Sequence, residues 1–352
     1  MKKEVQMVRF IDCYVPINTC NLRCPYCYIT QSKRWDAPLP EIKYSTETIV
    51  SALSQERLGG VCHFNICGNG ETLLCPQLVE IVRGLLEEGH FVFIVTNGTV
   101  SSVIEKMTNF PQKLRERLGF KFSFHYLELK ERGLLQRYFD NVRKARTAGC
   151  SYMVEITPYD ELIPYIDEIM NICKKEIGAL CHVTVARKHH NLHKGILTSL
   201  SKKQYFNTWK VFNSMLFQYK YSIFGKKRNE FCYAGDWSLT LNLLSGDLAP
   251  CYGFASEQNI YEDVSKPIKF YAVGNNCKEP HCYNGHAFLT LGVVPIMKTP
   301  CYSCMKNRVN EDGTEWLTPI MKKHLNTKLY NTHREYFLLR KIYTNIVRRK
   351  QG

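Results

Sequence analysis

The feature that most constrains the fold is a regular alternation of short apolar runs and helical stretches between residue 8 and about residue 217. The apolar runs have the length and the residue types of buried strands, and the stretches between them carry apolar residues at helical spacing. Strands that alternate with helices predict a parallel sheet, and right-handed crossovers favour a curved, barrel-like one. The six predicted strands are residues 8–15, 61–66, 91–95, 121–124, 152–156 and 181–185.

Helix signals support this reading between the predicted strands. Pro76 is expected in the first turn of a helix that carries an apolar face from Leu78 onwards and stops at Gly89. Gly149 is expected to end a second helix over residues 134–148 in the same way. From about Gly225 the alternation gives way to short β-like pieces rich in Gly, Pro, Asn and Cys. A segment with so few long apolar elements has little core of its own and is expected to need a bound metal to hold its fold. We therefore predict a second module organised by metal.

Three cysteines on the loop after the first predicted strand, Cys20, Cys24 and Cys27, give the strongest chemical signal. Three soft ligands on a tight loop suit zinc or an iron–sulfur cluster. A four-iron cluster held by three thiolates would leave one iron without a protein ligand, which is the open position that a substrate-binding metal site needs. The competing interpretation is a zinc knuckle.

The segment from Cys20 to Cys27 resembles the signature of the radical S-adenosylmethionine (SAM) superfamily, Cys-x3-Cys-x-aromatic-Cys, with Tyr26 at the aromatic position. The resemblance implies a [4Fe-4S] cluster whose open iron binds the amino and carboxylate groups of SAM, with Tyr26 near the adenine. It also implies a 5′-deoxyadenosyl radical that takes a hydrogen atom from the substrate, and an external one-electron reductant of the flavodoxin or ferredoxin type.

Two further turns match the same superfamily in chain order. The segment Gly68-Asn69-Gly70-Glu71-Thr72 resembles its Gly-Gly-Glu-Pro turn, with Asn69 and Thr72 as departures, and Thr96-Asn97-Gly98 matches a tripeptide that often follows its third strand. Glycines allow close backbone approach, and a carboxylate can accept hydrogen bonds from an ammonium group. The resemblance therefore makes Gly68, Gly70, Glu71 and Asn97 candidate SAM-binding residues. Because barrel sites lie at strand carboxyl ends, His125, Glu155 and Arg187 are further candidates, although each also fits a structural role.

The second module contains a Cys-x13-Gly-x4-Cys element from Cys232 to Cys251 and a close pair, Cys301 and Cys304. This pattern resembles the auxiliary-cluster domains called SPASM and twitch, and implies one auxiliary [4Fe-4S] cluster held by these four thiolates. Cys277, His281 and Cys282 match neither pattern cleanly. A zinc site and a second auxiliary cluster are open for them, and a structural role is the default expectation. A zinc ribbon is the alternative for the whole module. The scattered Cys62, Cys67, Cys75, Cys150, Cys173 and Cys181 are interpreted as small buried residues.

The formal net charge of +15 is concentrated at the end of the chain. From Ile320 onwards nine Lys and Arg stand against the single acid Glu335. Phe337, Leu338 and Ile342 interleave with these charges at helical spacing, so we predict a docked amphipathic helix with a solvated basic face. A contact with RNA or membrane is the less favoured reading of the tail. Two groups of cysteines at metal-like spacing, no signal-peptide features and no run of about 18 apolar residues favour a cytoplasmic protein without a membrane partner.

The fold prediction is α/β: a partial (β/α)6 TIM-like barrel over residues 1–225, a small cysteine-rich SPASM/twitch-like module over 226–310 and a basic helical tail over 311–352. The predicted activity is reductive cleavage of SAM followed by hydrogen-atom abstraction from a small-molecule or carbohydrate-type substrate, with the auxiliary cluster as electron acceptor or substrate anchor. Modification of a peptide is the nearest alternative, because the resemblance covers both substrate classes. The early first strand leaves no room for a preceding peptide-recognition domain, which favours the small molecule. A non-catalytic zinc protein that binds RNA is the rival from another class.

Overall fold

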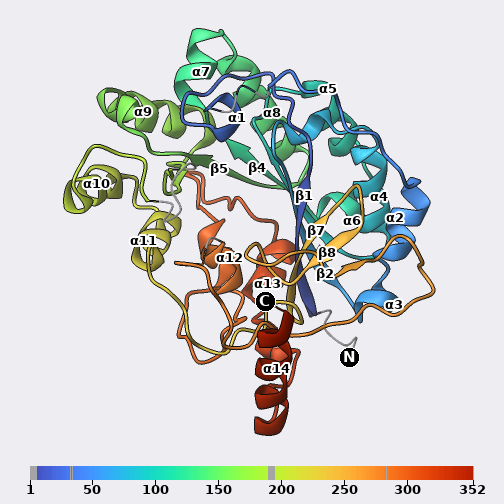
Figure 1. Cartoon of the computed structure of the whole chain (residues 1–352). Helices are drawn as coiled ribbons and strands as arrows, with labels where there is room; N and C mark the ends of the chain where they lie inside the picture. The colour runs from blue at the N-terminus through green and yellow to red at the C-terminus, as the bar shows by residue number, and fades with distance from the viewer. Residues whose placement is uncertain (1–5, 32, 34, 189–194, 283, 352) are drawn as a thin grey trace.

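One sheet runs through the molecule, with strand order β6-β5-β4-β3-β2-β1-β7-β8-β9 (Figure 1). The computed structural model describes residues 6–351 except 32, 34, 189–194 and 283. The first six strands are parallel and the sheet is not closed, as expected for a partial barrel. They are β1 (Arg9–Val15), β2 (Cys62–Gly68), β3 (Phe91–Thr96), β4 (Leu118–Ser123), β5 (Ser151–Ile156) and β6 (His182–Val183). All six predicted strands are therefore confirmed within a few residues.

Helices fill the connections between the strands and cover the outer face of the sheet (Figure 1). The predicted helix after Pro76 begins at Leu78, so Pro76 precedes the helix instead of lying in its first turn. Its buried face includes Leu78, Ile81 and Leu85. The α-helices are α1 (Tyr28–Gln31), α2 (Thr46–Ala52), α3 (Gln55–Leu58), α4 (Leu78–Glu87), α5 (Ser101–Thr108), α6 (Gln112–Arg115), α7 (Tyr126–Glu131), α8 (Leu135–Thr147), α9 (Ile166–Ile177), α10 (Lys202–Trp209), α11 (Met215–Ile223), α12 (Gly285–Phe288), α13 (Pro319–Asn326) and α14 (Leu338–Gln351).

The sheet continues past the expected boundary near residue 225. Strand β7 (Ser238–Asn242) pairs in parallel with β1, and β8 (Asp247–Ala249) and β9 (Gln258–Asn259) extend the same sheet in antiparallel fashion. β1 is thus an interior strand, and the cysteine-rich segment shares the backbone hydrogen bonds of the barrel sheet. Because the sheet is continuous, the cysteine-rich segment after residue 225 and the loop that carries Cys20, Cys24 and Cys27 belong to the same folded unit.

The C-terminal helix α14 docks through a polar face, contrary to the amphipathic prediction. Arg348 is buried, donates to the carbonyls of Ala272 and Tyr271 and forms an ion pair with Glu257. On the other side of α14, Leu338 is 72% exposed and Ile342 is half exposed. Paired polar groups hold this helix, and its large apolar side chains are exposed. The helix itself extends from the body of the molecule (Figure 1). None of the described helices combines the length and apolar character needed to cross a membrane.

Candidate active site

The predicted cluster cysteines share the loop that follows β1. The Cys24 thiol is buried and the Cys20 and Cys27 thiols are half-buried. Burial raises the pKa of Cys20 to about 11 and raises the pKa of Cys24 well above its usual value, and the neighbouring thiols add to the rise at Cys24. A buried thiol needs a nearby cation to stabilise its thiolate form. Three adjacent thiols of this kind are a donor set suited to a metal or a cluster.

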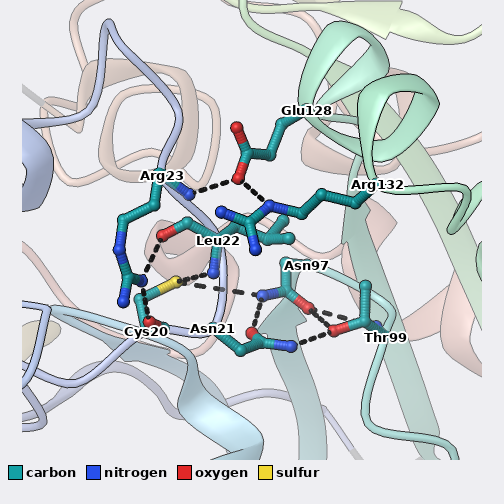
Figure 2. A network of polar contacts seen from close by, with 8 residues as sticks. All are labelled: Cys20, Asn21, Leu22, Arg23, Asn97, Thr99, Glu128 and Arg132. Carbon is teal, nitrogen blue, oxygen red and sulfur yellow. Dashed lines mark hydrogen bonds and ion pairs between the residues drawn. The ribbon is translucent and has the colours of Figure 1, made fainter.

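Asn97, on the turn after β3, braces the cysteine loop (Figure 2). Its side-chain amide donates to Oδ1 of Asn21 at 2.8 Å and lies 3.9 Å from Sγ of Cys20. Asn21 in turn donates to the hydroxyl of Thr99 at 2.7 Å, and that hydroxyl donates to Oδ1 of Asn97. The predicted tripeptide therefore lies beside Cys20, where Asn97 contacts the side chains of Cys20 and Asn21.

A second brace anchors the loop on α7 (Figure 2). The carboxylate of Glu128 accepts a hydrogen bond from the backbone N–H of Arg23 at 2.6 Å and an ion pair from Arg132, one turn further along the helix. The guanidinium of Arg23 donates to the carbonyls of Cys20 and Leu22. These contacts fix the middle of the loop between the first two thiols.

The turn after β2 packs against the chain that leads into Cys20. A Cβ on Gly70 would lie 2.0 Å from the carbonyl oxygen of Thr19, so only glycine fits here. The carboxylate of Glu71 is buried and accepts hydrogen bonds from the hydroxyl of Thr96 at 2.6 Å and the backbone N–H of Asn97 at 2.7 Å. Gly70 and Glu71 approach neighbouring protein groups, and neither lines the large cavity described next. Their contact with SAM stays a prediction.

A cavity of about 680 Å³ opens beside the cysteine loop, inside the curved sheet. Of the predicted SAM-binding residues, five line it and three do not. The lining residues are Tyr26, Gly68, His125, Glu155 and Arg187, together with the thiol-bearing Cys27, whereas Gly70, Glu71 and Asn97 lie behind the wall. Cys67, expected to be a buried structural residue, is only partly buried and also lines the cavity. Its side chain follows Ile66 on β2 and therefore points to the opposite face of the sheet, which here is the cavity face.

Aromatic rings form the cavity wall nearest the cysteines. The hydroxyl of Tyr26 hydrogen-bonds to Nδ1 of His125, and the ring of Tyr26 lies 4.3 Å from that of Tyr159, centroid to centroid. Burial lowers the pKa of His125 to about 4, so the imidazole is neutral at physiological pH. Tyr26 and His125 thus present aromatic rings to the cavity, which suit stacking against a planar ring such as a nucleobase.

The far side of the cavity holds charged residues that the sequence did not single out. Lys121 on β4, Lys220 on α11 and Lys306, which follows the 3-10 helix η4 (Tyr302–Met305), all line it. Glu155 forms an ion pair with Lys121 at 2.5 Å, and its neighbouring lysines hold the pKa of its carboxyl low despite burial. Asp12 on β1 is the other acid that lines the cavity. A sequence signal for these cavity charges exists only for Asp12, Lys121 and Glu155, each of which is a charged residue inside an otherwise apolar strand.

A second, smaller cavity collects four thiols in the cysteine-rich segment. Cys232, Cys251, Cys277 and Cys282 line it together with His281. Burial raises the pKa of Cys282 well above its usual value, and Cys251, Cys232 and Cys277 add to the rise. An isolated β-bridge pairs Cys232 with Gly274, with both backbone hydrogen bonds at 3.0 Å, and so brings the 274–282 segment alongside.

The predicted partners Cys301 and Cys304 do not line this cavity. Cys304 is exposed, and both thiols lie near Lys328, whose ammonium donates to the carbonyls of Thr290 and Pro300. The cavity thus groups Cys232 and Cys251 with Cys277 and Cys282, which differs from the grouping with Cys301 and Cys304 that the spacing predicts. Among the described residues no three His, Cys, Asp or Glu side chains converge closely enough to bind a single ion. The ligands of a cluster bind different irons and need not converge on one point.

Residues 14–171, somewhat less than half of the chain, match the family model described as the Radical SAM superfamily. Among solved structures, SuiB of Streptococcus suis bound to S-adenosylmethionine is similar at 15% identity, with a TM-score of 0.51 over 74% of this chain and 64% of that one. The chain therefore spans less than two thirds of the length of SuiB. A second similar structure is anSMEcpe with bound AdoMet, at 15% identity and a TM-score of 0.49 over 72% of this chain and 79% of that one. A third is BtrN in complex with AdoMet and 2-DOIA, at 17% identity and a TM-score of 0.38 over 74% of this chain and 82% of that one. No curated protein matches the sequence.

Proposed function

We propose that this chain is a radical SAM enzyme that cleaves S-adenosylmethionine reductively and abstracts a hydrogen atom from a small-molecule or carbohydrate-type substrate. One observation carries the proposal: three thiols share one braced loop within the segment that matches the Radical SAM superfamily, and Cys27 among them lines the 680 Å³ cavity. Cys20, Cys24 and Cys27 would hold a [4Fe-4S] cluster with one iron open. When bound and reduced by a flavodoxin- or ferredoxin-type donor, the cluster supplies the electron that splits SAM.

The chain's own residues orient and shield the reaction. Tyr26, backed by Tyr159 and His125, offers a flat surface to the adenine, and Gly68 brings strand backbone to the cavity without a side chain in between. Asn97, Glu128 and Glu71 keep the cysteine loop at one distance from the cavity through the hydrogen bonds described above. Exclusion of water from the cavity by bound SAM and substrate would protect a reactive radical from quenching.

The four-thiol cavity supports a second, auxiliary [4Fe-4S] cluster held by Cys232, Cys251, Cys277 and Cys282. The thiols belong to one small enclosed space, and four soft ligands on a loop-rich segment suit iron–sulfur chemistry. Tyr252, next to one of these cysteines, lines the large cavity, so the two sites are neighbours. That position suits a role as electron acceptor or substrate anchor.

Anaerobic reconstitution tests the proposal. The protein should carry about eight irons per chain, four for each cluster, and should release 5′-deoxyadenosine when given dithionite and SAM. Cys24→Ala should abolish the release, whereas Cys150→Ala, which removes a buried thiol from outside both sites, should not. Colourless protein that binds zinc and releases no 5′-deoxyadenosine would refute the enzyme. Deuterium transfer from a labelled peptide into 5′-deoxyadenosine, without transfer from small molecules, would show that the substrate is a peptide and not a small molecule.

A further inference from the structure

The charges that line the large cavity do not balance. Three lysines reach it from separate elements, Lys121 from β4, Lys220 from α11 and Lys306 from the chain after η4, and Arg187 adds a fourth cation. The acids that line it among the described residues are Asp12 and Glu155. All three lysines influence the carboxyl of Glu155, which places them around one point of the cavity.

Both acids are already engaged. Glu155 pairs with Lys121 at 2.5 Å. One oxygen of Asp12 accepts a hydrogen bond from Asn65 at 2.7 Å, and the other accepts from the hydroxyl of Tyr252 at 2.6 Å and from the amide of Asn284. Neutral donors thus saturate Asp12, and the cation nearest to Glu155 is Lys121.

Lys220 and Lys306 lack a carboxylate partner among the described residues. The ammonium of Lys220 donates to the hydroxyl of Thr184. The ammonium of Lys306, a residue only 4% exposed, lies 3.8 Å from Sδ of Met153 and 4.0 Å from the ring centroid of Phe93. Burial lowers the pKa of each lysine to about 7, and the positive charge of Lys121 adds to the effect. The carboxylate of Glu155 opposes this shift at both lysines, without a direct ion pair to either. A buried cation without a counter-ion is costly, and an anion in the cavity would remove that cost.

His286, at the same end of the cavity, has an unused hydrogen-bonding atom. Its Nδ1 is buried and has no hydrogen-bond partner within the described part of the chain. Lys220, Lys121 and Lys306 all depress the pKa of His286, which burial already lowers well below its usual value. The neutral imidazole of His286 and the ammonium groups of Lys220 and Lys306 therefore face one region of the cavity. No carboxylate among the described residues forms an ion pair with these two ammonium groups. SAM carries a sulfonium and an ammonium against one carboxylate, so it would add positive charge.

We propose that Lys220, Lys306 and His286 form a subsite for an anionic oxygen group of the substrate, a carboxylate or a phosphate. This subsite rests on the proposed function, because it takes the cavity to be the place where substrate meets SAM. It narrows the substrate from any small molecule to one that carries a negative charge. Lysine suits either anion because it acts as a point charge without a fixed fork geometry.

Anion-dependent thermal stabilisation tests the subsite in the reconstituted full-length protein with SAM. Malonate and inorganic phosphate serve as the carboxylate and phosphate probes, each compared with chloride at equal ionic strength. At saturation we expect one of the two to raise Tm by about 2 °C or more over chloride. Lys220→Met and Lys306→Met should each abolish this difference, and Lys175→Met, at a side chain 82% exposed on α9, should keep it.

Removing a buried unpaired charge should not unfold the protein, so both methionine variants should keep or raise their Tm in chloride. Should either fail to fold, Glu155→Gln gives an independent reading, because loss of the local carboxylate should enlarge the anion-dependent shift. An equal shift in wild type and in both lysine variants, or no shift with either probe, would overturn the subsite. Release of 5′-deoxyadenosine is measured on the same samples. Its absence with lysine-dependent anion binding intact would refute the proposed function and leave the anion site.

Discussion

The two groups of thiols in this chain are built in opposite ways. Cys20, Cys24 and Cys27 lie within eight consecutive residues, so local sequence places them together and the turns after β2 and β3 only brace them. Cys232, Cys251, Cys277 and Cys282 are spread over fifty-one residues and meet because the Cys232–Gly274 bridge and the β7–β8 pairing fold the chain back on itself. A local site is visible in the sequence, whereas a site assembled by tertiary pairing is not.

Iron content gives the sharpest separation of the two sites. Cys282→Ala should lose about half of the iron, because only the second site is damaged, and should still cleave SAM. Cys304→Ala, the matched control, should keep its full iron content because this exposed thiol lies outside the four-thiol cavity. Iron analysis of both variants after anaerobic reconstitution makes the measurement. The reverse result, with iron lost from Cys304→Ala and kept in Cys282→Ala, would restore the grouping expected from sequence spacing.

Substitution of Gly70 should have the next largest effect, a loss of stability, because the backbone there lies against the carbonyl of Thr19. A methyl group there would collide with the carbonyl of Thr19, so Gly70→Ala should lower stability by about 1–3 kcal/mol and loosen the first cysteine loop. Gly195→Ala is the control, since among the described residues a Cβ there comes within 4 Å only of the side chain of Lys188, at 4.0 Å. Urea unfolding measures the loss. Equal midpoints for the two variants would show that the turn after β2 does not brace Cys20.

The same contrast explains how much the sequence could predict. Strand patterns come from residues a few positions apart, and all six predicted strands are present. The grouping of Cys277 with Cys232 depends on a bridge formed across more than forty residues, and spacing rules carry no information about it. The lysines of the large cavity arrive from positions 121, 220 and 306. Lys121 stands out as a charge in an apolar strand, but Lys220 and Lys306 are unremarkable in their own segments.

Helix α14 shows a different limit. The apolar residues of its sequence predict the docking face, yet specific polar pairs decide the outcome. Arg348 meets Glu257 and two carbonyls, and Asn345 exchanges hydrogen bonds with Asn275. These partners lie some seventy to ninety residues away in the chain, so the sequence of the helix alone could not reveal them.

The amide brace beside Cys20 should matter less than the backbone contact at Gly70. Asn97→Ala removes the donor to Asn21 and leaves buried polar groups without partners, at a cost of about 1–2 kcal/mol. Asn275→Ala, which removes an exposed amide near α14, should cost less and leave cluster binding unchanged. Thermal unfolding and iron retention are measured together. A loss of stability without faster loss of iron from Asn97→Ala would mean that the brace supports the fold and not the first cluster.

The ion pair between Glu128 and Arg132 should give the smallest effect. Glu128→Gln keeps an acceptor for the backbone N–H of Arg23 and loses only the charge that attracts a partly exposed arginine one turn away. Such pairs contribute about 0.5 kcal/mol. Glu87→Gln, which breaks the exposed i,i+4 pair with Arg83 on α4, is the matched control and should cost no more. A much larger loss of unfolding free energy for Glu128→Gln in urea, together with loss of iron from the first site, would show that the charge of Glu128 holds the cysteine loop. The loop would then depend on a contact from α7 and not on its local sequence alone.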